Sequence, residues 1–229
     1  MGGGSQSKQI DNISSHLMPL YYTKEPVTER DIELCNGTWS AILSDDVPKY
    51  KKLLDEPGFD FNSCRIYFYT VFYNRLMELQ PGTKGAFRNG IDTVGSFMTK
   101  MMSVSLTQLD NQQSFHEAMR GLALRHSQRG IQSYEYFPFG DVLFHALEET
   151  LGNLYTMDVD RAWKNVYSSM LTIIIPVTID FGLKLANRGE TAADIKRKIL
   201  VSNSMSFSEA DRTGESAAVP QDAAGGDSK

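Results

Sequence analysis

Cysteine is scarce in this chain, whose 229 residues include only Cys35 and Cys64, and neither belongs to a CxxC pair. Such sparse thiols offer no disulfide framework, so we expect both to be buried and reduced, as in cytosolic proteins. The N-terminus carries nothing that resembles a secretory signal. These absences predict a cytoplasmic location.

Positive charge is also in short supply. The chain has 23 Lys and Arg residues against 28 Asp and Glu residues, which gives a formal net charge of -5 and a pI near 5.4. No long basic stripe interleaved with aromatic residues appears in it. A surface that binds nucleic acid needs cations to neutralise phosphates, and we therefore expect no nucleic-acid partner.

Long hydrophobic runs are missing as well. The longest run, Met170 to Ile179, contains Pro176 and is about half as long as a bilayer-spanning helix, so it predicts a buried helix. At the N-terminus, Gly2 stands where myristoylation occurs, but Gln6 replaces the Ser or Thr of that motif. If Gly2 is acylated, a single chain would give only weak, reversible attachment to the inner face of a membrane.

The apolar residues that are present, with Tyr, Trp and Cys included, make up 41% of the chain, which is enough for a core. Their spacing is three and four rather than two, which predicts an all-α fold. We expect a flexible segment over residues 1–26, a helical domain over 27–186 and a disordered tail over 202–229. The intervening segment 187–201 contains a short basic helix that either docks on the core or contacts a membrane or a partner.

Within this domain, Thr28 and Asp31 form a capping-box pattern that opens the first helix. Pro81 ends the second helix, and the residues between the two helices, 44–62, form a long connection that we interpret no further. The remaining helices are predicted over about 91–109 and 114–126, from Pro138 onward, and over about 157–185 with a kink at Pro176.

Three segments then occur in a recognisable order. The first is VFYNRLMELQPGTKGAF, in which Tyr73, Pro81 and Phe87 are separated by eight and six positions. The second, LALRHSQRGIQSYEYFPFGDVLFHALEETLG, places Tyr136 ten residues after His126, and the third is RAWKNVYSSML. From about Thr28 to about Asp180, the chain resembles the globin family, in detail the globin domain of flavohaemoglobins and, more distantly, neuroglobin-like chains.

The resemblance implies a globin fold of about six to eight helices around haem b, with His126 as the proximal iron ligand. Phe87 would stack on the haem, Leu122 would pack on the side of His126, and Tyr136 would lie behind it. The full set of haem-contacting residues that the resemblance implies, besides His126, is Tyr73, Phe87, Phe97, Met101, Leu122, Ile131 and Tyr136.

The chemistry of haem supports this choice of histidine. Iron held by one imidazole needs a neutral histidine at the end of a helix in apolar surroundings, with the opposite face free for a diatomic gas. His126 follows apolar positions at a helix end, whereas His16 lies in the N-terminal segment. His116 falls near the start of a helix and His145 lies off an apolar face, so neither fits.

The distal side has no histidine in the third helix, and family spacing leads to Phe97, with Met101 one turn later. These two side chains are equally consistent with an ordinary core. Lys100 could reach inward as a second iron ligand, but a solvated lysine is the simpler interpretation. Tyr73 could donate a hydrogen bond to a bound O₂ and slow its release, or it could be buried with its hydroxyl on the backbone.

The function that the resemblance implies is reversible binding of O₂, and of NO or CO, for storage or sensing, and NO dioxygenation would use the same pocket. Two flavohaemoglobin features are absent, since the chain has no reductase domain with its GxGxxG-type loop, and the family's proximal acid aligns with Thr178, two residues before Asp180. NO dioxygenation would therefore need a separate reductase, which the sequence does not identify. A haem-free interaction module with a globin fold is the alternative of another class.

Overall fold

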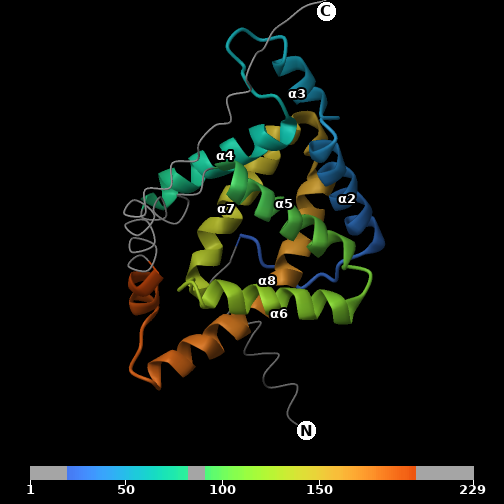
Figure 1. Ribbon diagram of the computed structural model, residues 1–229. Helices are drawn as coiled ribbons and strands as arrows, with labels where there is room; N and C mark the ends of the chain where they lie inside the picture. The colour runs from blue at the N-terminus through green and yellow to red at the C-terminus, as the bar shows by residue number, and fades with distance from the viewer. Residues whose placement is uncertain (1–19, 82–90, 200–229) are drawn as a thin grey trace, which may run out of the picture.

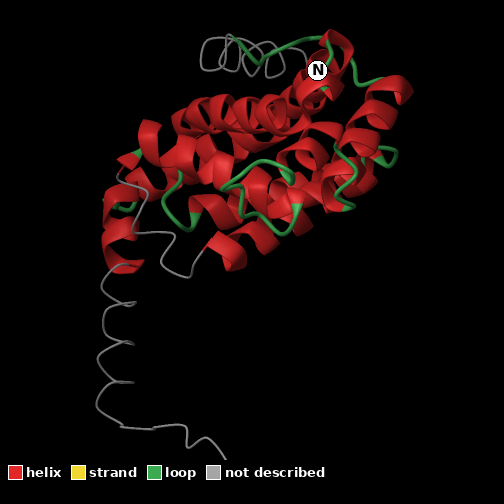
Figure 2. Cartoon of the chain, turned by 90° about the horizontal axis from the view of Figure 1, so that it is seen from above, coloured by secondary structure: helices red, strands yellow, loops and turns green. Residues whose placement is uncertain are grey.

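The computed structural model describes residues 20–81 and 91–199, and these residues form helices and loops without strands (Figure 2). The all-α prediction is confirmed. The helices are α2 (Glu29–Leu43), α3 (Pro48–Leu53), α4 (Cys64–Leu79), α5 (Ile91–Thr107), α6 (Gln112–Ser127), α7 (Tyr136–Leu151) and α8 (Met157–Ala186), with short 3₁₀ turns η2 (Ser133–Glu135) and η3 (Gly152–Leu154). A further helix covers residues 192–199, at the end of the described part of the chain.

The capping box predicted for the first helix is present. The Thr28 hydroxyl accepts from the Asp31 backbone N–H at 3.1 Å, and the Asp31 carboxylate accepts from the Thr28 backbone N–H at 2.9 Å. The same carboxylate accepts from Asn165 Nδ2 of α8 at 3.2 Å. Local capping thus also joins the start of α2 to α8.

The core lies where α8 packs against α2 and α6, and where α7 packs against α4 (Figure 1). Two buried tryptophans give it hydrogen-bonded anchors. Trp39 Nε1 donates to Ser103 Oγ of α5 at 3.0 Å, and Trp163 Nε1 donates to Thr38 Oγ1 at 3.0 Å. These bonds satisfy the indole N–H groups that burial would otherwise leave without water.

Helix α8 is long and apolar enough, by length and mean hydropathy, to cross a membrane, and among the described residues it is the one helix that meets this test. Core helices of soluble proteins meet it too, and the inward face of α8 is buried against its neighbours. Pro176 lies inside the helix, and the end of α8 leaves at a different angle from its beginning (Figure 1). A change of direction is expected where a proline removes a helical hydrogen bond.

The segment 44–62 is more ordered than a plain connection, because it contains α3. The Tyr50 hydroxyl donates to the Phe61 carbonyl at 2.9 Å, and Lys49 Nζ pairs with the Glu149 carboxylate of α7 at 3.0 Å. Helix α3 has only six residues, which are too few to show a helical period, so the sequence pattern did not predict it.

Candidate functional site

His126 lies in the last turn of α6, as the helical spacing predicts. Asn111 begins the helix by accepting from the Ser114 backbone N–H at 3.0 Å. The preceding inward positions are buried, including Leu122 at 7% exposure, one turn before the histidine. His126 itself is half-buried. The packing of α6 on α8 thus places the imidazole at the edge of the core, where it is partly exposed.

Tyr136, the first residue of α7, meets this imidazole. Its hydroxyl lies 3.3 Å from His126 Nδ1, and the two ring planes differ by 28°. Tyr136 is buried, and its backbone carbonyl accepts a 2.7 Å hydrogen bond from the Tyr167 hydroxyl of α8. His126 and Tyr136, which the sequence analysis singled out, are therefore in contact. Tyr136 occupies Nδ1 of the imidazole, which leaves Nε2 as the nitrogen that could bind a ligand.

A tight turn joins the two residues. The His126 carbonyl accepts from the backbone N–H groups of Arg129 at 2.9 Å and of Ile131 at 3.1 Å. Gly130 has a φ of +80°, a left-handed conformation that favours glycine. Ile131 is half-buried and packs against the core, so the turn brings a third predicted haem contact close to the histidine.

The electrostatics of this pair suit a neutral metal ligand. The pKa of His126 is lowered from 6.5 to about 4, chiefly by burial and in the same direction by the charges of Arg129 and Arg125. Burial raises the pKa of Tyr136 to about 12. At neutral pH both rings are uncharged, and an imidazole must be neutral to donate a lone pair to a metal.

Thr178 occupies the position where the resemblance would put a proximal acid. It is buried in α8, and it interacts with Tyr136, lowering the pKa of that phenol against the effect of burial. Asp180 is exposed and pairs with Lys184 at 2.7 Å. The groups that lie beyond His126 are therefore the Tyr136 phenol and the Thr178 hydroxyl. Neither Thr178 nor the exposed Asp180 places a carboxylate there.

On the distal side, Tyr73 of α4 is only 3% exposed and packs edge-on against Phe72, with ring centroids 5.4 Å apart. Burial raises the pKa of its phenol above the ordinary value of 10, so it stays protonated. Met101 is half-buried against the core, whereas Lys100 is exposed, as expected of a solvated lysine.

Two predicted contacts lie outside the residues that the structure describes. Phe87 belongs to the segment 82–90, and Phe97 belongs to α5, but its side chain is not among those described.

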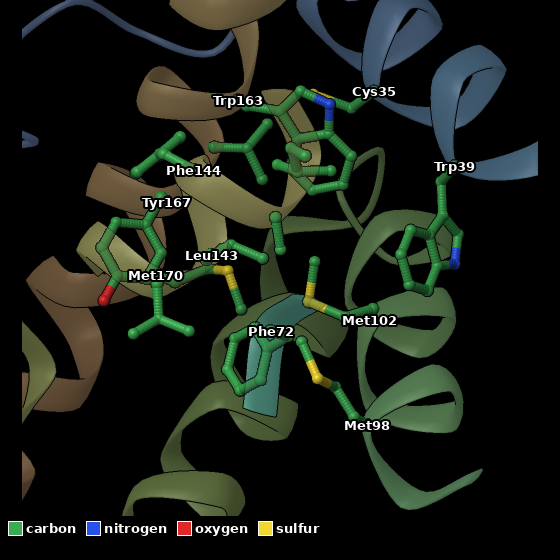
Figure 3. Close-up of a cluster of buried hydrophobic side chains, with 14 of the residues drawn as sticks. Cys35, Trp39, Phe72, Met98, Met102, Leu143, Phe144, Trp163, Tyr167 and Met170 are labelled. Carbon is green, nitrogen blue, oxygen red and sulfur yellow. The ribbon is translucent and has the colours of Figure 1, made fainter. Parts of the chain in front are cut away.

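Met98 and Met102 of α5 are not among the haem contacts that the resemblance implies. Both are buried, at 7% and 3% exposure, and they point with Phe72 into the core (Figure 3). Helix α5 also approaches α4 very closely at Gly95, where a Cβ atom would lie 2.5 Å from the Tyr69 ring. The i, i+4 methionine spacing was the available signal, but it does not distinguish core from pocket lining.

A cleft of about 680 Å³ lies between α7 and the start of α8. Several of its charged groups are paired, for example Lys164 Nζ with Asp160 at 2.6 Å and Arg75 with Asp141 at 3.6 Å. None of the predicted haem contacts lines it. Within the described ranges, no cluster of three His, Cys, Asp or Glu residues could hold a free metal ion.

The donor set around His126 therefore fits haem better than a bare metal ion. Haem needs one neutral imidazole from the protein and apolar contacts for the porphyrin. His126, with Nδ1 held by Tyr136, supplies the first requirement, and Leu122 and Ile131 supply part of the second. A hydrogen-bonding partner on the other ring nitrogen fixes the orientation of a ligating imidazole.

Comparison with known proteins shows which sequences the chain is similar to. The Globin family model matches residues 70–174. Neuroglobin of Dissostichus mawsoni is 26% identical over 184 residues, which cover 74% of this chain and 99% of that protein. The Globin, cuticular isoform, of Nippostrongylus brasiliensis is 29% identical over 139 residues, covering 56% of this chain and 80% of that protein.

A Flavohemoprotein of Rhizobium meliloti (strain 1021) is 22% identical over 106 residues, which cover 45% of this chain and 26% of that protein. The neuroglobin match therefore extends over more of the chain than the flavohemoprotein match. The family match includes Tyr73, His126 and Tyr136, whereas Thr178 lies beyond its end.

Proposed function

Because this chain belongs to the globin family, we propose that it binds haem b through Nε2 of His126 and reversibly binds O₂ at that haem, for oxygen storage or gas sensing. NO and CO are expected to bind at the same position. The observation that carries the proposal is the position of the His126 imidazole, half-buried at the end of α6 with Nδ1 facing the Tyr136 hydroxyl at 3.3 Å.

When bound, haem supplies an iron with an open coordination position for a diatomic gas. The chain's own residues set the properties of that position. Tyr136 holds the imidazole ring in one orientation, and Leu122 and Ile131 keep its surroundings apolar. Phe87, Phe97 and Met101 are proposed to contact the porphyrin.

Tyr73 is proposed to stabilise the bound gas. Its phenol keeps its proton because burial raises its pKa, so it can donate a hydrogen bond to a ligand that carries partial negative charge. Such a bond is stronger in a buried, low-dielectric site than in water. The expected consequence is slow release of O₂.

Reversible binding is favoured over oxidative chemistry by what lies behind His126. A carboxylate partner would make the imidazole more electron-rich, whereas Tyr136 and Thr178 are both uncharged. NO dioxygenation with a separate reductase is the second candidate, and similarity to part of a flavohemoprotein supports it. We propose a cytosolic location, with weak attachment to the inner membrane face if Gly2 is acylated.

The test is ligand release from the haem-loaded ferrous protein, measured by stopped flow for the parent and for Tyr73→Phe. Loss of one buried hydrogen bond should speed O₂ release by roughly tenfold or more, while CO release, which depends less on such a bond, should change less. Equal O₂ rates would remove Tyr73 from the mechanism. Failure of the purified chain to take up haem would refute the proposed function.

A further inference from the structure

The helix over residues 192–199 docks on the turn that joins His126 to Tyr136. Lys196 Nζ of this helix lies 3.0 and 3.2 Å from the two carboxylate oxygens of Glu135, which precedes Tyr136. The Glu135 side chain is only 23% exposed, so this ion pair is less screened than most surface pairs.

Glu135 has a second role in the same turn. Its carboxylate also accepts a 2.8 Å hydrogen bond from the Gln132 backbone N–H, which begins η2. The Glu135 carboxylate therefore links Gln132 in the turn to Lys196 of the 192–199 helix.

The helix contacts the beginning of the turn at a different point. A Cβ atom on Gly130 would lie 2.7 Å from Lys196 Cγ and 2.8 Å from the Ala192 carbonyl oxygen. The backbone of the helix is thus seated directly on the glycine, and only a residue without a side chain leaves room for it.

The other cations of the helix do not take part. Lys198 pairs with Glu190 at 2.8 Å, and Arg197 pairs with Asp194 at 3.6 Å, so both pair with acids of their own segment. The helix is capped at Thr191, whose hydroxyl accepts from the Asp194 backbone N–H at 3.2 Å. Among its cations, Lys196 is therefore the one that pairs with the proximal turn, next to the close contact at Gly130.

We propose that the 192–199 helix is a proximal clamp, in which Lys196 and Glu135 are positioning residues that hold His126 against Tyr136 for haem binding. The reason is geometric, since the two partners of the 3.3 Å contact are carried by the two ends of the clamped turn. Opening the turn separates Nδ1 from the phenol and frees the imidazole to rotate. The inference rests on the proposed function for its relation to haem.

The first measurement uses the full-length, haem-free chain and needs no ligand. Amide hydrogen exchange is followed at Gly130, Ile131 and Gln132 in the parent, in Lys196→Ala and in the matched control Lys198→Ala. Loss of a partly buried ion pair should speed exchange in the turn by roughly two- to fivefold in Lys196→Ala alone. Lys196→Arg keeps the charge and should restore the parent's exchange.

The second measurement is the rate at which the haem-loaded chain releases haem to an excess of a haem-scavenging apoprotein. Lys196→Ala should release it several-fold faster than the parent and Lys198→Ala. Gly130→Ala, which forces the helix off its seat, should do the same. Gly58→Ala is its control, because Gly58 has a similar φ of +86° but an added Cβ would meet nothing within 4 Å.

Faster exchange and faster haem release confined to the clamp variants is the expected result. Parent-like exchange in Lys196→Ala would overturn the clamp, and faster exchange with unchanged haem release would overturn its positioning role. A parent chain that takes up no haem would instead mean failure of the proposed function, together with the relation to haem inferred from it. A parent that binds haem while the clamp variants behave identically would refute the clamp alone.

Discussion

His126 should make the stability of the haem-free protein depend on pH. In the folded chain its pKa is lowered to about 4, chiefly by burial, against 6.5 for a free imidazole. Between these values the unfolded chain binds a proton that the folded chain does not, so the free energy of unfolding falls as the pH falls. The stability is fully present above pH 6.5 and is lost by about pH 4.

The size of this loss of stability follows from the difference between the two pKa values of His126. At about 1.4 kcal/mol per pH unit, the fall from 6.5 to about 4 corresponds to a loss of about 3 kcal/mol. Because His126 is half-buried, solvent screening brings the expectation to about 2–3 kcal/mol. This is a large share of the stability of a typical domain.

The assay is urea unfolding of the haem-free chain at a series of pH values, compared with His126→Leu, which has a similar volume and no titrating group. The parent should lose about 2–3 kcal/mol more than His126→Leu between pH 7 and pH 4. His145→Leu removes an exposed imidazole from α7 and should keep the parent's dependence. Parallel curves for the parent and His126→Leu would refute the argument that His126 is held neutral.

Three further substitutions test the site. Tyr136→Phe removes the phenol at His126 and should speed haem release roughly 10- to 100-fold, whereas the exposed Tyr134→Phe should not, and equal rates would exclude a role for Tyr136. Leu122→Ala should lower the free energy of unfolding of the haem-free chain by about 2–5 kcal/mol, because Leu122 is only 7% exposed. In a urea titration, a loss below about 1 kcal/mol would contradict the burial of Leu122. Thr178→Glu should place a carboxylate beside Tyr136 and lower the midpoint potential of the haem. The expected shift is about 59 mV for each 1.4 kcal/mol by which the carboxylate stabilises ferric iron. An unchanged potential in a redox titration would show that Tyr136 transmits no charge effect to His126.

The sequence predicted those features that depend on neighbouring residues. The Thr28 capping box needs only a three-residue spacing, and the helix with His126 at its end needs only an apolar period and its termination. The contact between His126 and Tyr136 came from the family resemblance and its spacing of ten. Helix α3 was missed because a single short helix leaves no periodic signal.

Features that depend on tertiary contacts could not be predicted from the sequence. The pair between Lys196 and Glu135 joins residues 61 positions apart, and nothing in either local sequence marks the other as its partner. The same holds for Thr178, whose place beside Tyr136 depends on how α8 packs under α7. Periodicity gives the face of a helix, but only packing determines what that face meets.

The central claim, that His126 is the ligand that holds haem, is tested most directly by the absorption spectrum of the purified chain after addition of haem. The parent and the control His145→Ala should show the sharp Soret band of a protein-ligated haem, and CO should shift that band in the ferrous state. His126→Ala should lose this spectrum, and added imidazole should restore it by filling the space of the missing ring. A His126→Ala spectrum identical to that of the parent would contradict the account.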